Sequence, residues 1–214
     1  MASFKKQYSL NSLVSLYTVV VGVALSLAVV TLVGDNLADT KLYSVALFFA
    51  FLVTLLPFCH GALRHVEETY ENTAKAPKYL VFDFLLLFIH ALLFVLLAQL
   101  LANPGQYVWM FIWVLIIDSI WSVIAPSSPS KDGKFSVQHR WGIVNFLTFS
   151  ILIASALVTE VSFFVPARDP EKVAGVVVIV SIVRTAIDYL WCRKYYFEFF
   201  EEDSEPGQPQ DKEA

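Results

Sequence analysis

Residues Tyr79–Ala102 read YLVFDFLLLFIHALLFVLLAQLLA, an apolar run interrupted by the ionisable side chains of Asp83 and His90. About 20 consecutive apolar residues in an α-helix cross the hydrocarbon core of a bilayer. The run is therefore long enough to span a membrane. Five other runs have the same character, and the sequence predicts six transmembrane helices over Ser12–Gly34, Leu42–Leu63, Tyr79–Ala102, Tyr107–Ala125, Trp141–Val165 and Val173–Trp191.

The composition agrees with this interpretation. Hydrophobic residues make up 57% of the 214 residues, and the mean hydropathy is +0.63. A soluble domain is about half apolar. The connections between the runs are too short to hold a soluble domain, so we expect an all-α polytopic membrane bundle over residues 1–202. Residues 203–214 are rich in Pro, Gln and acidic residues, which predicts a disordered acidic tail.

The flanking charges predict the orientation, because cytoplasmic loops carry an excess of Lys and Arg. One side holds Lys5, Lys6, Arg64, Lys75, Lys78, Lys131, Lys134, Arg140, Arg193 and Lys194, and the other holds Lys41, Arg168 and Lys172. We therefore expect an integral protein of the plasma (inner) membrane with both termini in the cytoplasm. The net charge is −4 and no basic surface is evident, so direct nucleic-acid binding is not expected. Cys59 and Cys192 would face a reducing compartment, which disfavours a structural disulfide.

Polar residues recur at one depth in the half of the bundle that we expect to be cytoplasmic. Ionisable side chains inside a membrane are costly and mark functional sites by default. The predicted polar layer comprises His60, Arg64, Asp83, His90, Asp118, Asn145, Arg184 and Asp188. We expect Arg64 and Arg184 to pair with the three aspartates around a cavity. The alternative is a buried ion-pair network that only fixes the register of the helices.

The four histidines raise two alternatives that involve a cofactor. Haem needs axial ligands on facing helices, and His60 with His90 could supply one such pair. His65 and His139 are expected at or outside the membrane interface. A catalytic zinc site could draw two or three ligands from His60, Asp83, His90, Asp118 and Asp188, but no HExxH spacing is present. The leading prediction includes no cofactor.

Three local features complete the predictions. Pro57 should kink the second helix and free a backbone carbonyl near the polar layer. Small residues at Gly22 and Ser26 suit close packing of the first helix, either within this bundle or against another subunit. Glu160 is expected in the outer half of the fifth helix, where it would snorkel to the interface or line an outer vestibule.

The leading functional hypothesis is an oligomeric channel or pore-forming effector that conducts ions or small solutes. We expect it to be gated from the cytoplasmic side, by an activating partner or ligand. A repeated-arginine voltage sensor and a TVGYG filter are both absent. The alternatives are a metal-dependent membrane enzyme acting on a lipid-like substrate, a haem b electron carrier and a secondary transporter.

Overall fold

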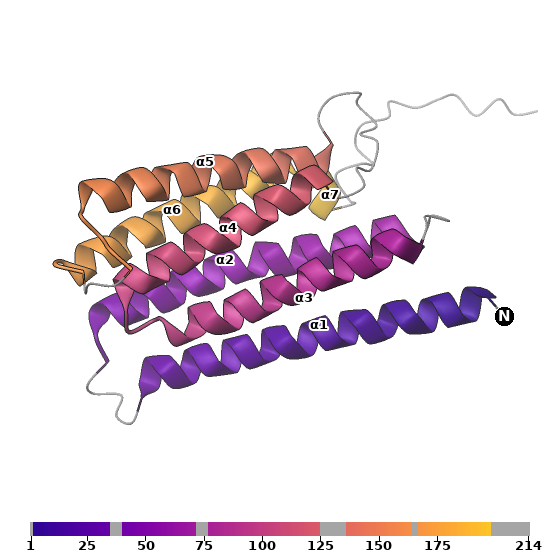
Figure 1. Cartoon of the computed structure of the whole chain (residues 1–214), viewed down its shortest axis with the longest axis horizontal. Coiled ribbons are helices and arrows are strands. Elements are labelled where there is room, and N and C mark those ends of the chain that lie inside the picture. The colour runs from indigo at the N-terminus through magenta and orange to yellow at the C-terminus, as the bar shows by residue number, and fades with distance from the viewer. Residues whose placement is uncertain (1, 35–39, 72–76, 125–135, 164–166, 198–214) are drawn as a thin grey trace, which may run out of the picture.

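The computed structural model describes residues 2–34, 40–71, 77–124, 136–163 and 167–197, and their side chains except those of 2–10, 71 and 77–79. This part of the chain is a helical bundle (Figure 1). Its helices are α1 (Ala2–Val33), α2 (Leu42–Val66), the π-helix η2 (Glu67–Glu71), α3 (Pro77–Gln99), α4 (Pro104–Ile124), α5 (Val137–Val158), α6 (Pro170–Trp191) and α7 (Arg193–Tyr196).

Six of these helices are long and apolar enough to cross a membrane, which confirms the predicted number of spans. α1 packs mainly on α3, α2 on α6 and α4 on α5. α1 therefore lies at the edge of the bundle (Figure 1). The N-terminus and α7 lie at the same end, which is called the α7 end below. The predicted tail at 203–214 falls outside the described residues.

The helix bounds differ from the predicted spans at several ends, since α1 already begins at Ala2 and α3 ends at Gln99. The differences at the ends of α2 and α5 have a clear structural basis. α2 does not stop at Leu63 but runs to Val66 and continues as η2 to Glu71, beyond the apolar run. α5 ends at Val158 rather than Val165, because the chain turns at Glu160, whose φ is +53°. Glu160 thus lies past the helix end and is exposed, so its predicted place inside the helix is wrong. The backbone N–H of Val161 bonds to the carbonyl of Ala156 and closes this turn.

Side chains at the helix starts supply caps where the backbone lacks partners. Ser136 Oγ accepts from the backbone N–H of His139 at the start of α5. Asp169 Oδ1 accepts from the N–H of Lys172 at 3.1 Å, and Pro170 occupies the first turn of α6. These caps set the first residue of α5, which lies at the α7 end of the bundle, and the first residue of α6, which lies at the opposite end.

The half of the bundle away from α7 is filled by a close-packed apolar core. Its largest fully buried side chains include Leu47, Phe51, Phe94, Tyr107 and Phe111. The polar residues gather in the other half, beside α7. The fold therefore places an apolar half and a polar half end to end along the helices.

The face of α1 that packs against the bundle is not the small-residue face, Gly22 and Ser26, that the sequence indicated. Ala24 and Ala28 are fully buried against the bundle, whereas Ser26 is exposed. A side chain at Gly22 would meet no atom within 4 Å. The Gly22–Ser26 stripe therefore points away from this chain's own core.

Candidate functional site

Pro57 determines one contact between α2 and α6. A proline in a helix has no N–H to give to the carbonyl four residues before it, which here is that of Val53. The hydroxyl of Thr185 on α6 donates to this Val53 oxygen at 2.9 Å. The freed carbonyl predicted from the sequence is thus present, and a residue of the neighbouring helix satisfies it.

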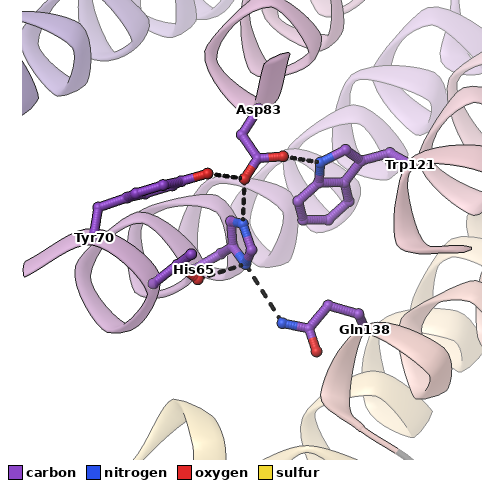
Figure 2. Close-up of polar contacts among 6 residues, drawn as sticks. His65, Tyr70, Asp83, Trp121 and Gln138 are labelled. Carbon is purple, nitrogen blue, oxygen red and sulfur yellow. Dashed lines mark hydrogen bonds and ion pairs between the residues drawn. The ribbon is translucent and has the colours of Figure 1, made fainter. Parts of the chain in front are cut away.

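The first buried polar cluster joins the end of α2 to α3, α4 and α5 (Figure 2). His65 Nε2 lies 3.0 Å from Asp83 Oδ2, and the Tyr70 hydroxyl donates to the same oxygen at 2.5 Å. The Trp121 indole N–H donates to Asp83 Oδ1 at 3.2 Å. Gln138 Nε2 lies 3.5 Å from His65 Nδ1. Both carboxylate oxygens of Asp83 therefore have partners from different helices.

The second cluster lies deeper and is built around Asn145 on α5. Arg184 Nε donates to Asn145 Oδ1 at 3.0 Å, and the Asn145 amide donates to Asp118 Oδ2. His90 Nε2 lies 3.6 Å from Asp118 Oδ1, which is beyond hydrogen-bond distance. The guanidinium carbon of Arg184 also lies 4.5 Å from the centre of the Phe58 ring. Asn145 thus relays the contact between Arg184 and Asp118.

α7 closes this second cluster from the end of the bundle. The Tyr196 hydroxyl donates to Asp188 Oδ2 at 3.2 Å. Burial, followed by the charge of Asp188, raises the pKa of Tyr196 far above its usual value, so the hydroxyl keeps its proton. The same two causes, burial first, raise the pKa of the Cys192 thiol to about 12. Both groups beside Asp188 are therefore neutral.

Arg64 holds α7 in place. Its Nη1 lies 3.0 Å from Glu67 Oε2, and its Nη2 lies 3.6 Å from Glu68 Oε1. Its Nε donates to the backbone carbonyl of Tyr195 at 3.2 Å. Arg64 thereby ties η2 to α7 across the end of the bundle.

A small cavity of about 30 Å³, which is large enough for water, lies between the second cluster and α7. Its polar lining comes from α1 and from α3 to α7 and comprises Tyr17, His90, Asp118, Trp121, Trp141, Arg184, Asp188 and Tyr196. In the part of the chain that the structure describes, Arg184 Nη1, Asp188 Oδ1, His90 Nε2 and Trp141 Nε1 are buried without a hydrogen bond of good geometry, although Trp141 and the Cys192 thiol both contact the Asp188 carboxyl. Polar atoms buried in this way mark places that a ligand, ion or water would contact.

No protein-family model, curated protein or solved structure matches the chain. The role of the cavity is therefore inferred from its own chemistry. It combines titratable groups, a fixed cation and buried polar atoms.

The structure brings together five of the eight residues predicted for the polar layer, namely His90, Asp118, Asn145, Arg184 and Asp188. Asp83 belongs instead to the cluster with His65. The predicted pairing of Arg64 with an aspartate is wrong, because glutamates three and four residues further along the same helical segment reach it first.

The histidine predictions have mixed outcomes. His60 packs on the rings of Tyr189 and Tyr196, while His90 packs on Phe58 beside Asp118, so the two imidazoles have different surroundings. Within the described residues, no three His, Cys, Asp or Glu side chains gather closely enough to hold a metal ion. His65 is fully buried inside the protein, and its predicted depth at the membrane interface stays a prediction.

Sequence reasoning missed Tyr70, Gln138 and Tyr196, which contribute to the two clusters. Tyr70 and Gln138 lie in polar stretches that resemble loops, outside the apolar runs. One signal in the sequence was usable. Thr69 lies four residues after His65, so the two would share a helical face if the second helix continued beyond its apolar run. In the structure Thr69 Oγ1 does lie 3.4 Å from His65 Nδ1.

Proposed function

We propose that the protein conducts ions or small solutes across a membrane, with the cavity as part of the path and α7 on the cytoplasmic side. The observation that carries this proposal is the set of buried polar atoms without a hydrogen bond of good geometry, on Arg184, Asp188 and His90, which line one cavity in a membrane-spanning bundle. Because such atoms are costly in a membrane, their presence favours a functional role for the cavity. A register-fixing network would instead be expected to satisfy its own members.

α7 would act as the gate of this path. The Tyr196 hydroxyl bonds to Asp188 at the cavity, and Tyr195 and Tyr196 are both buried. Arg64 binds the backbone of Tyr195 while it is paired with Glu67 and Glu68. A cytoplasmic partner or ligand that displaced Arg64 would release α7 and open the cavity.

The opposite half would be the closed part of the path in this state. Its centre is filled by fully buried side chains such as Phe51, Phe94 and Phe111. Conduction therefore requires these helices to separate, or a second subunit to contribute. The outward Gly22–Ser26 stripe is available for such a contact, and a homo-oligomer is part of the proposal.

Ion flux into proteoliposomes tests this function. We expect flux above that of empty liposomes, and more of it with Tyr196→Phe, because this change removes the hydroxyl that holds α7 to Asp188. Tyr189→Phe is the matched control, since it removes a neighbouring hydroxyl that contacts His60 instead. Flux at the level of empty liposomes for both wild type and Tyr196→Phe contradicts the proposal.

A membrane enzyme acting on a lipid-like substrate is a second candidate, and one observation favours it. A small apolar pocket of about 20 Å³ lies between α1, α2 and α3. It shares Tyr17, Ala62 and Leu87 with the polar cavity, so an apolar group of a lipid-like substrate that entered it would lie beside the polar groups. Mass spectrometry of lipids retained by the purified protein tests this candidate. Loss of a retained lipid with Ala62→Phe supports it, and the absence of any retained lipid contradicts it.

A further inference from the structure

The charges around the cavity do not balance. Asp118 and Asp188 face it from α4 and α6, and Arg184 is the one arginine or lysine in its lining. With both carboxylates ionised and His90 neutral, the lining carries one excess negative charge. A buried excess charge is strongly unfavourable unless a cation or proton neutralises it. An anion is disfavoured for the same reason.

The available oxygen atoms suit a proton better than a metal cation. Asp118 Oδ2 accepts from Asn145, and Asp188 Oδ2 accepts from Tyr196. The other Asp118 oxygen lies 3.6 Å from His90 Nε2, and Cys192 and Trp141 also contact the Asp188 carboxyl, so few oxygen atoms remain for a cation. The helices that carry the lining are continuous there, so their carbonyls are taken up by helical hydrogen bonds. The carbonyl of Val53, which Pro57 frees, is occupied by Thr185. Metal cations are held in membranes by unwound carbonyls or rings of oxygens, whereas a proton needs one oxygen.

The half of the bundle away from α7 also favours a proton over a metal cation. Its core is packed with apolar side chains, so a hydrated metal ion has no room. Buried hydroxyls are nevertheless present on Thr54, Tyr107 and Ser181, and these atoms lack hydrogen-bond partners among the described residues. Protons move between hydrogen-bonding groups and water without a wide opening.

We propose that the cavity is a proton-binding site centred on Asp188 and Asp118 and that it discriminates against metal cations. If the proposed ion conduction is correct, the proton is the ion that crosses. A proton from the cytoplasmic side forms an O–H bond at Asp188 Oδ1, and the water that delivered it regains a proton from its neighbour. Release to Asp118 Oδ1 or to His90 Nε2 breaks that O–H bond, forms one new O–H or N–H bond at the acceptor and leaves Asp188 as the carboxylate, so no electrons are transferred.

Titratable and charged groups surround Asp188 on several elements. They are Tyr17 of α1, His60 of α2, His90 of α3, Asp118 of α4, Arg184 and Tyr189 of α6, and Tyr196 of α7. Cys192, which follows α6, also lies beside Asp188 and is neutral, like Tyr196. Proton uptake is therefore assigned to the carboxylates and His90.

Infrared difference spectra of the protein in liposomes, recorded between acidic and alkaline buffer, test the binding site directly. We expect a protonated-carboxyl band in wild type that is lost or shifted in Asp188→Asn and retained in Glu171→Gln, an exposed acid on the same helix. Spectra that are identical for wild type and Asp188→Asn overturn the proton site. Folding of each variant is checked by circular dichroism and by a single peak in gel filtration.

Ion selectivity distinguishes a proton-binding site from ion conduction in general. A pH-sensitive dye reports proton flux in proteoliposomes, and labelled sodium and rubidium report metal cations in the same preparation. Proton flux without metal-ion flux supports both proposals. Metal-ion flux without proton flux overturns the proton assignment and leaves ion conduction standing. An Asp188 carboxyl band without any flux supports the proton site and contradicts conduction.

Discussion

Thr185 on α6 donates its hydroxyl hydrogen to the carbonyl oxygen of Val53 on α2, at 2.9 Å. This carbonyl is free because Pro57 has no N–H to offer it. Thr185 lies next to Arg184 in the sequence, so the same turn of α6 that carries the cavity arginine is fixed to α2. The bond therefore connects a helix irregularity to the geometry of the site.

Thr185→Val should destabilise the fold by about 0.5–2 kcal/mol, because it leaves the Val53 carbonyl without a donor. Pro57→Ala restores an N–H that can satisfy this carbonyl. Thr185→Val should therefore cost less in a Pro57→Ala background, and unfolding in mixed micelles measures all four proteins. Equal losses in the two backgrounds would show that the carbonyl does not depend on Thr185.

Removing one member of the His65–Asp83 pair should have a large effect. The two side chains are almost fully buried, so Asp83→Leu leaves His65 and Tyr70 without their shared acceptor. We expect a loss of about 3–5 kcal/mol in the free energy of unfolding. The double variant His65→Leu, Asp83→Leu should lose less than the sum of the single losses. Strict additivity in a denaturation series would argue against the pair.

Gly61 and Gly175 offer a matched pair of glycine-to-alanine changes. A Cβ at Gly61 would lie 3.2 Å from Trp141 Cζ2 and 3.3 Å from the Tyr196 hydroxyl oxygen, whereas one at Gly175 meets nothing within 4 Å. Gly175→Ala should stabilise its helix by up to about 1 kcal/mol. Gly61→Ala should instead push Tyr196 away from Asp188 and lower the melting temperature. Equal shifts for the two variants would mean that α7 does not pack as described.

The thiol of Cys192 should make stability depend on alkaline pH. Its pKa is raised by burial from 9.0 to about 12, so the folded protein holds a proton that the unfolded chain releases. The resulting stabilisation is complete below about pH 9 and is lost as the pH rises toward 12. The difference in melting temperature between wild type and Cys192→Ser should therefore shrink on going from neutral to strongly alkaline buffer. A difference that stays constant over this range would contradict the buried neutral thiol.

The sequence predicted the six spans because long apolar runs leave few alternatives in a membrane protein. It also predicted that His90, Asp118, Asn145, Arg184 and Asp188 share one layer, since depth follows directly from position along each helix. It could not predict partners. Arg64 pairs with Glu67 and Glu68, three and four residues further along the same helical segment. His65 is buried because the helix continues as η2 beyond the apolar run of α2.

The remaining errors concern backbone turns and segments outside the apolar runs. Hydrophobicity continues from Val158 to Val165, but the turn at Glu160 ends α5 early, and apolar composition does not encode that turn. The burial of Tyr196 depends on how α7 folds back under the bundle. Such contacts arise from tertiary packing and have no periodic signal in one sequence.

Proton and cation flux through proteoliposomes holding Asp188→Asn, beside wild type and Glu171→Gln, tests the central claim most directly. The variant keeps the size of the side chain and removes the charge at the cavity. The account predicts that flux is changed or lost in Asp188→Asn while Glu171→Gln behaves like wild type. Unchanged flux in a well-folded Asp188→Asn protein would contradict the claim that ions pass through this cavity.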